Sequence, residues 1–316
     1  MDTHLTTSPT EAAQFVRRGQ LAAFPTETVY GLGADALDAS AVESIFEAKG
    51  RPADNPLIVH LVDREQLPQV VASVPVEAGR LLSAFTPGPL TVILPKADAL
   101  PAVVTAGLDT VGVRFPGHAT ARAFLRACDT PVAAPSANRS GRPSPTDWRA
   151  VEEDLGGRIA CILKGERTDA GVESTVLDCT TTPPVLLRPG ALPVERLEAV
   201  VGPVGGEESD RPEEPPRSPG TKHRHYAPAA QVRLVDRPSE AEPGSAAAYI
   251  GRDRPDNPAA FGECVIVPDV ESYARELFHF FRTCDRSGCS VIYAQRMPDD
   301  GLGRALNDRL RRAAAR

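Results

Sequence analysis

The most informative part of this chain is Phe24-Pro-Thr-Glu-Thr-Val-Tyr-Gly-Leu-Gly33, followed by Lys49-Gly-Arg51-Pro and Asn55-Pro-Leu-Ile-Val-His60. These neighbouring segments combine small polar side chains, glycines and two cations. Glycine lets the backbone adopt conformations that other residues avoid and lets a ligand approach closely. Fixed cations suit phosphate and carboxylate groups. We therefore predict that this region forms a pocket for a phosphate-bearing ligand.

The bulk composition limits the class of protein. The chain has 316 residues, 41% hydrophobic content and a net charge of −7, with a pI near 5.5. This length is typical of two domains rather than one. Because proteins with a large nucleic-acid footprint usually have a basic surface, the acidic balance argues against such a footprint. A local cationic pocket remains compatible with this balance.

Cysteine usage and hydropathy point to a cytoplasmic protein without a membrane partner. The N-terminal residues show no charged-then-apolar leader, and no apolar stretch approaches the roughly 20 residues of a membrane span. No CxxC pair occurs, so we expect buried free thiols rather than disulfides or metal ligands. The six cysteines are Cys128, Cys161, Cys179, Cys264, Cys284 and Cys289.

Strands alternate with helices over the first two thirds of the chain, which indicates an α/β or α+β domain over one large sheet. Ser8-Pro-Thr-Glu11 reads as a capping box that starts a helix ending at Gly19. A second helix ends at Gly50 and places Lys49 in its last turn. We expect strands at 21–24, 57–62, 90–94, 111–115, 132–134, 159–163, 174–177 and 185–187, and further helices near 75–85, 118–128, 146–155 and 193–201.

A change in composition after Val204 divides the chain. Residues 205–220 are rich in Pro, Gly and Glu and lack apolar periodicity, so we predict a first domain over 1–204, a linker over 205–228 and a second domain over 229–316. Strands at 232–235, 246–250, 264–267 and 290–293, with helices near 270–284 and 302–314, indicate a small Rossmann-like unit. Its lack of a GxGxxG motif gives no reason to predict a dinucleotide.

Four cations are candidates for anion binding. Lys49 and Arg51 flank Gly50 at a helix end. The alternative to anion binding is that both are solvated charges, which the helix dipole favours at the C-terminus of a helix. Arg114 and Arg188 interrupt or close apolar strands, and a buried charge is costly unless it is paired. Each of these two arginines either forms an internal salt bridge or binds a planar anion.

Two polar segments follow or precede predicted strands. Ser136 and Asn138 lie two residues apart after the strand at 132–134, where α/β folds commonly bind ligands. Residues 171–175 bring polar groups to the start of another strand. Plain turns are the alternative for both segments, and a satisfied core histidine is the alternative for His60. The sequence contains neither a P-loop motif nor a GxSxG motif, and it shows no zinc-ligand spacing.

Taken in order, these segments resemble the YrdC-like family, and the two-domain layout resembles its long form. The resemblance spans almost the whole chain and rests on PTETVYGLG (25–33), KGRP to NPLIVH (49–60), PGPLT (87–91), VGVRFP (111–116), APSANRSGRPSPT (134–146), GVESTVLD (171–178), LLRPG (186–190) and SPGTKHRHYAP (218–228). It implies a large twisted mixed sheet in the first domain.

The resemblance also implies an activity. Members of the long form make L-threonylcarbamoyl-AMP and pyrophosphate from L-threonine, bicarbonate or CO2, and ATP, with Mg²⁺ on the phosphates. A separate tRNA threonylcarbamoyl transferase complex then uses the product to modify the adenosine next to the anticodon. Such chemistry needs no covalent enzyme intermediate, so catalysis would rest on positioning and on neutralising phosphate charge.

Family roles map onto individual residues. The catalytic set falls on Lys49, Arg51, Ser136 and Asn138. Nucleotide contacts are implied for Arg51, Asn55, Thr110, Ser136, Ser144, Arg188 and Tyr226, and L-threonine contacts for Thr28, His60, Arg114, Ala134 and Ser174. No resident metal ligand is implied. The chain departs from the family pattern at Thr221, His223 and Lys164.

Two other functions are open at this stage. An RNA-binding or ribosome-maturation module could use the same cationic concavity, although the chain offers few aromatic side chains for base stacking. Carbamoyl transfer, as in hydrogenase-maturation proteins with a related domain, would call for cysteine clusters that this chain does not contain.

Overall fold

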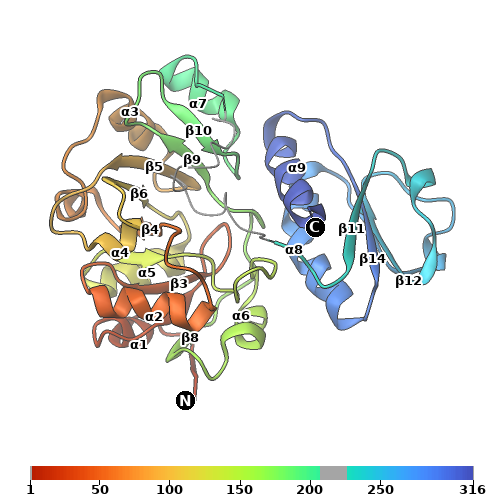
Figure 1. The fold of residues 1–316 in the computed structure, drawn as a ribbon, viewed down its shortest axis with the longest axis horizontal. Helices are drawn as coiled ribbons and strands as arrows, with labels where there is room; N and C mark the ends of the chain where they lie inside the picture. Colours follow the sequence, from red (N-terminus) through yellow and green to blue (C-terminus); the bar gives the residue numbers. More distant parts are fainter. Residues whose placement is uncertain (1, 207–225, 316) are drawn as a thin grey trace.

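The computed structural model describes residues 2–206 and 226–315. They form two units, each built around its own sheet, with the first unit at the left of Figure 1 and the C-terminal unit at the right. Most of the predicted 205–228 linker, including Thr221 and His223, lies outside the described residues. The exact domain limits therefore remain a prediction.

Ten described strands form the sheet of the first unit, in the order β1-β8-β2-β3-β7-β4-β6-β5-β9-β10. The sheet contains both parallel pairs, such as β4 with β6, and antiparallel pairs, such as β5 with β6, so the predicted mixed sheet is confirmed. The strands are β1 (His4–Thr6), β2 (Ala22–Phe24), β3 (Gly31–Asp35), β4 (Ile58–His60), β5 (Leu90–Pro95), β6 (Thr110–Arg114), β7 (Val132–Ala134), β8 (Cys161–Leu163), β9 (Thr175–Asp178) and β10 (Val185–Arg188).

The helices of the first unit are α1 (Pro9–Val16), α2 (Ala39–Lys49), η1 (Arg64–Gln69), α3 (Val76–Phe85), α4 (Ala102–Thr105), α5 (Ala119–Cys128), α6 (Trp148–Leu155) and α7 (Val194–Val201). Six of these helices lie close to their predicted positions, whereas η1 and α4 were not predicted. Gly50 ends α2 in the left-handed conformation, as expected. The capping box of α1 forms only in part. Ser8 accepts from the Glu11 amide, but the Glu11 carboxylate bonds Thr6 and His4 instead of returning to Ser8.

Strands β1 and β3 were not predicted from the sequence. The Gly-Leu-Gly start of β3 lacks the β-branched residues typical of strands. Packing explains these glycines. A Cβ on Gly33 would lie 2.8 Å from Cγ1 of Val132, and one on Gly31 would lie 3.1 Å from the Phe24 ring. The informative stretch therefore consists of the end of β2, a polar turn at 25–30 and the start of β3, which pair antiparallel.

The two faces of the large sheet are covered differently. On one face, side chains such as Val59, Val113 and Val92 pack with α2 and α3 in the main core. On the other face, α1 and α5 cover the part formed by β8, β2, β3 and β7. Ile58, His60, Gly112 and Arg114 belong to the rest of that second face, since residues two apart share a face. This part of the sheet is left for the site.

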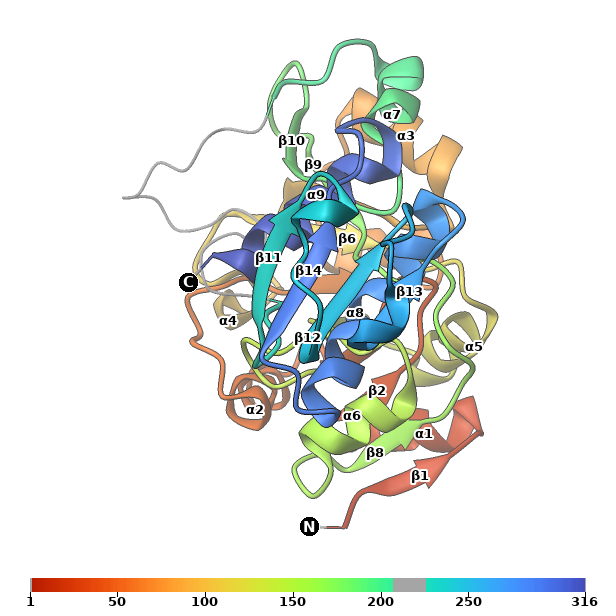
Figure 2. The ribbon, with the colours of Figure 1, turned by 90° about the vertical axis from the view of Figure 1, so that its right-hand side faces the viewer.

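The C-terminal unit contains a four-stranded parallel sheet in the order β11-β14-β12-β13, seen in front in Figure 2. Its elements are β11 (Gln231–Val235), η2 (Pro238–Glu240), β12 (Gly244–Gly251), η3 (Pro258–Ala260), β13 (Phe261–Ile266), α8 (Val270–Arg286), β14 (Val291–Gln295) and α9 (Gly301–Ala314). The predicted small parallel unit is confirmed, but its layers differ from a doubly wound fold. Both long helices pack on the face toward the first unit, whereas a separate cluster around Tyr249 and Tyr293 fills the other face.

All six cysteines are free thiols, as expected, and only Cys264 is half-buried rather than buried. Among the helices of the described ranges, none is both long and apolar enough to cross a bilayer.

Candidate active site

A cavity that is partly open to solvent lies on the uncovered half of the large sheet. Ten of the fourteen predicted site residues line it: Thr28, Arg51, His60, Arg114, Ala134, Ser136, Asn138, Ser174, Arg188 and Tyr226. The first nine come from the first unit, and Tyr226 immediately precedes the C-terminal unit. Lys49, Asn55, Thr110 and Ser144 do not line the cavity.

The lining is strongly cationic. Arg51, Arg114, Arg142 and Arg188 face a single lining carboxylate among the described residues, that of Glu173. Guanidinium groups bind phosphate and carboxylate through paired hydrogen bonds. A concave surface with this charge balance concentrates anions.

Arg114 defines one end of the cavity. It is buried, and its Nη2 donates to Oε1 of Glu27 at 2.8 Å and to Oγ1 of Thr26 at 3.5 Å. Burial raises the pKa of Glu27, but the charge and hydrogen bond of Arg114 outweigh burial, so the net pKa is lowered and the carboxylate is ionised. Arg114 Nε lacks a hydrogen-bond partner among the described residues. The salt-bridge alternative is therefore realised, with one donor left over.

His60 lies beside Arg114, one strand away in register. Burial, followed by the Arg114 charge, lowers the pKa of His60 to about 3, so the ring is neutral at physiological pH. In the tautomer protonated on Nδ1 the ring donates to the Ile58 carbonyl at 3.2 Å, and its edge meets the Phe24 ring. Thr28 completes this end and shares a hydrogen bond of 2.9 Å with Thr26.

The loop from Pro135 to Ser144 forms another wall. Ser136 Oγ donates to Asn138 Oδ1 at 2.5 Å, and Asn138 Nδ2 donates to the carbonyls of Arg139 and Arg142 at 2.8 and 2.9 Å. Asn138 thus closes the loop on itself. The hydroxyl of Ser136 faces the cavity beside it.

Lys49 hydrogen-bonds to the same loop without lining the cavity. Its Nζ donates to the carbonyls of Ser136 and Asn138 at 2.6 and 2.5 Å, and the residue is 3% exposed. Burial, then the nearby charge of Arg51, lowers the pKa of Lys49 well below its usual value. Burial likewise lowers the pKa of Arg51 to about 10, which leaves it charged at neutral pH.

From Arg51 in the cavity lining, Asn55 and Thr110 extend the site beyond the cavity. Arg51 Nη2 donates to the carbonyls of Asn55 and Pro56 at 3.1 and 3.2 Å. Asn55 is fully buried, and neither its Oδ1 nor its Nδ2 has a hydrogen-bond partner among the described residues. Thr110 begins β6, whereas Arg114 ends it, and these two residues share a face. Four residues of strand separate them by roughly 13 Å.

Arg188 also lines the cavity. Its Nη2 donates to the carbonyl and the hydroxyl of Ser174 at 2.9 and 3.2 Å. Burial lowers the pKa of Arg188, partly offset by Tyr226. Glu173, next to Ser174, accepts from the Ser144 hydroxyl at 2.6 Å, so Ser144 touches the lining through this carboxylate.

Several residues of the site were not predicted from sequence, although they lie inside the motifs. They are Glu27, Tyr30, Arg142 and Glu173 in the first unit, and Arg282 and Arg309 in the C-terminal unit. A charged residue between predicted site residues, such as Glu173 before Ser174, was an available signal. Lys164, a departure from the family pattern, lies with its ammonium 5.6 Å from the centre of the Trp148 ring, a cation–π contact.

Comparisons with known proteins identify the family. The Sua5, YciO and YrdC family model, described as "Telomere recombination", matches residues 14–190. The model described as "Threonylcarbamoyl-AMP synthase, C-terminal domain" matches residues 192–315. The fold is that of the YrdC-like class, and the chain belongs to the Sua5, YciO and YrdC family, in the long form with the C-terminal domain.

Individual relatives cover nearly the full length. The threonylcarbamoyl-AMP synthase of Pyrococcus abyssi is 47% identical over 96% of this chain and 93% of its own. That of Bacillus subtilis is 44% identical over 96% and 92%. The crystal structure of P. abyssi Sua5 complexed with L-threonine superposes with a TM-score of 0.91 at 44% identity, covering 99% of this chain and 98% of that one.

Proposed function

We propose that this chain is a threonylcarbamoyl-AMP synthase that binds L-threonine and ATP side by side in the described cavity. The family membership and the 44–47% identity to enzymes of that name over nearly the whole chain establish the activity. The observation that carries the proposal for the site is the lining of four arginines and one carboxylate over an uncovered sheet face. That lining suits a substrate pair with several negative charges.

L-threonine would occupy the end formed by Thr28, His60, Arg114, Ala134 and Ser174. Support comes from the structure of the P. abyssi relative, which contains L-threonine, and from Arg114, whose buried Nε is unpartnered among the described residues. A substrate carboxylate would accept from Arg114 and share it with Glu27. The neutral His60 ring would add a hydrogen-bonding wall without a second charge.

ATP would occupy the side formed by Arg51, Ser136, Asn138 and Arg188, with Tyr226 at the mouth. Its far end would reach toward Asn55 and Thr110 at the other end of β4 and β6, where the buried Asn55 amide has both polar atoms available. Ser144 would act through Glu173. Lys49 would keep the Ser136 and Asn138 backbone in place rather than touch the phosphates, since its Nζ already donates to two carbonyls.

The reaction then needs two bond-forming events. The threonine amine attacks bicarbonate or CO2 and becomes an N-carboxylate, with water lost when bicarbonate is the donor. A carboxylate oxygen next attacks the α-phosphorus of ATP, the bond to the β-phosphate oxygen breaks, and pyrophosphate leaves. Positioning by Arg114 and charge neutralisation by Arg51 and Arg188 supply the catalysis.

Mg²⁺ would enter as part of the nucleotide. The described residues contain no group of three or more His, Cys, Asp or Glu side chains that could hold a metal ion. The single lining carboxylate, Glu173, is already bonded to Ser144 and Arg309. The donor set therefore does not fit a resident ion, and triphosphate oxygens are the better ligands for Mg²⁺.

The product is a mixed anhydride between a carbamic acid and AMP, so its consumer must be an acyl-group transferase. We propose the tRNA threonylcarbamoyl transferase complex as that partner. The chain's net charge of −7 fits a small-molecule enzyme better than a direct tRNA-binding protein.

Product analysis tests the function. Purified protein mixed with ATP, L-threonine and bicarbonate should give threonylcarbamoyl-AMP and pyrophosphate by mass spectrometry, and omitting any one substrate should abolish both. ATP turnover that does not depend on threonine would refute the proposal.

A further inference from the structure

Two arginines of the C-terminal unit are buried against the first unit. Arg282 on α8 is 3% exposed and Arg309 on α9 is fully buried. Arginine is almost never buried to this extent without an ionic partner. Arg282 pairs with Asp154 of the first unit, and Arg309 pairs with Glu173 of the first unit as well as with its neighbour Asp308.

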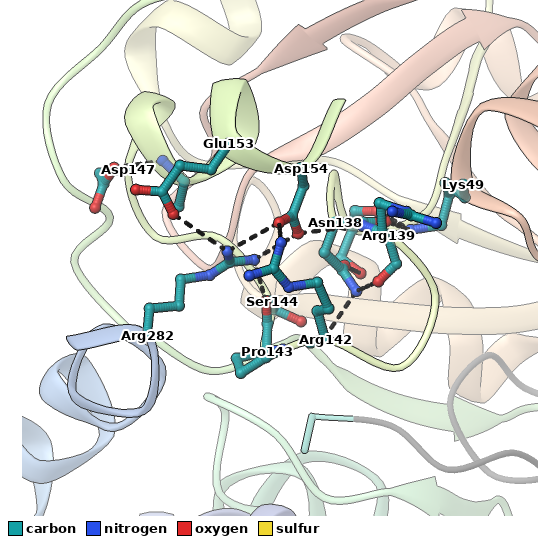
Figure 3. Close-up of polar contacts among 12 residues, drawn as sticks. Lys49, Asn138, Arg139, Arg142, Pro143, Ser144, Asp147, Glu153, Asp154 and Arg282 are labelled. Carbon is teal, nitrogen blue, oxygen red and sulfur yellow. Dashed lines mark hydrogen bonds and ion pairs between the residues drawn. The ribbon is translucent and has the colours of Figure 1, made fainter. Parts of the chain in front are cut away.

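Arg282 makes a two-pronged contact, seen in Figure 3. Its Nη2 and Nη1 donate to the two carboxylate oxygens of Asp154 at 2.8 and 3.2 Å, and Nη2 also donates to the Pro143 carbonyl at 2.5 Å. The Asp154 side chain is completely buried. This fork geometry is specific to arginine, because lysine offers only a point charge.

Asp154 connects Arg282 with the wall of the cavity. Besides Arg282, it accepts from the Arg139 amide at 3.2 Å and pairs with Arg142, whose side chain lines the cavity. Both belong to the Pro135–Ser144 loop, whose carbonyls also anchor Asn138. Arg282 therefore contacts Asp154, and Asp154 contacts the loop that lines the cavity.

Arg309 contacts the same loop through Glu173, at the residue next to Pro143. Its Nε donates to Glu173 Oε2 at 2.7 Å, while Glu173 Oε1 accepts from Ser144 at 2.6 Å. Arg309 also donates to the Pro189 carbonyl at 3.0 Å and lies 5.3 Å from the centre of the Tyr226 ring. The two arginines thus fix the loop at Pro143 and at Ser144.

The approach of α8 is close enough to make these contacts specific. A Cβ on Gly171, two residues before Glu173, would lie 2.3 Å from the Ala274 carbonyl oxygen and from the Arg275 Cα. Arg275 Nε donates to the Asp169 carbonyl at 2.9 Å, and Arg167 pairs with Glu276. The backbone of the first unit therefore lies directly on the helix that presents Arg282.

We propose that Arg282 and Arg309 are positioning residues through which the C-terminal unit sets the Pro135–Ser144 loop, and with it the ATP side of the cavity. Among the described residues, neither arginine hydrogen-bonds to any of the five residues that would hold L-threonine, which are Thr28, His60, Arg114, Ala134 and Ser174. The C-terminal unit would thus control nucleotide geometry selectively. This inference rests on the proposed role of the loop in nucleotide binding.

The test compares Arg282→Lys and Asp154→Asn in the full-length protein, with Arg286→Lys as control, because Arg286 on the same helix forms a half-exposed pair with Glu153. Misplacing a catalytic wall by about 1 Å can cost roughly 100-fold. We expect Arg282→Lys and Asp154→Asn each to lower kcat/KM for ATP by roughly 10- to 100-fold, with the L-threonine Kd, measured calorimetrically without ATP, changed less than about threefold. Arg286→Lys should match the parent.

The double variant Arg282→Lys/Asp154→Asn should lose less than the two single variants combined, because the two residues share one contact. Arg309→Lys should likewise raise KM for ATP. Parent-like ATP kinetics in both Arg282→Lys and Asp154→Asn would overturn the proposal, and so would a parallel loss of threonine affinity, which indicates general loosening. If one variant does not fold, the other decides. An inactive parent would instead refute the proposed function.

Discussion

Replacing Arg114 should weaken threonine binding and also destabilise the fold. In the single variant Arg114→Met, Glu27 is left buried without its partner, and breaking a buried ion pair from one side costs about 3–5 kcal/mol of stability. The Glu27 side chain retains 15% exposure, so the lower part of that range applies. The single variant alone therefore cannot distinguish lost binding from lost folding.

The double variant Arg114→Met/Glu27→Gln removes this ambiguity, because neither charge remains. We expect its free energy of unfolding to lie within about 1 kcal/mol of that of the parent, because replacing a buried ion pair by uncharged groups often changes stability little. Its threonine affinity should still fall. One charge-assisted hydrogen bond contributes about 1.5–3 kcal/mol, which corresponds to a roughly 10- to 150-fold weaker Kd.

Calorimetric titration with L-threonine, alongside urea unfolding, is the assay. Arg122→Met is the matched control, because Arg122 is a partly exposed arginine that contacts the Val62 carbonyl and Asp63 away from the cavity. If the double variant binds L-threonine within about threefold of the parent, Arg114 does not hold the substrate carboxylate.

Three further predictions concern His60, Gly171 and Lys49. His60 has a pKa of about 3 in the folded protein, against about 6.5 in the unfolded chain. The unfolded chain therefore binds an extra proton below about pH 6.5, and the free energy of unfolding should fall by about 3 kcal/mol by pH 4. Urea unfolding of His60→Gln should show a smaller decline over this pH range than the parent. Gly171→Ala should destabilise by clearly more than Gly107→Ala in the same assay, because both have positive φ but only Gly171 lies against α8; equal losses would contradict the close approach. Lys49→Met should lower kcat at least tenfold, as expected for a displaced loop, while the threonine Kd stays near that of the parent; unchanged turnover would contradict its role in holding the loop.

Sequence patterns predicted most of the fold because most elements carry a strong local signal. The helix ending at Gly50 and the strands around Val92 and Val113 follow apolar periodicity, and the structure places them as predicted. The exceptions have a physical reason. Strand β3 begins with glycines that neighbouring side chains require, so its composition does not resemble a strand.

The site was predictable as a set of residues but not as a set of contacts. Family motifs brought ten residues to one cavity, yet the direction of Lys49 toward backbone carbonyls could not be inferred from its position in the last helical turn. The partners of Arg282 and Arg309 lie more than a hundred residues away along the chain. Sequence spacing contains no information on such pairs, because they form only when the two units dock.

A crystal structure of the protein with L-threonine and a non-hydrolysable ATP analogue would show whether both substrates share the cavity. We expect the threonine carboxylate on Arg114, the phosphates on Arg51 and Arg188, and the threonine amine facing the α-phosphate with room for one carboxyl group between them. Nucleotide bound elsewhere, or threonine bound with its carboxylate away from Arg114, would contradict this expectation.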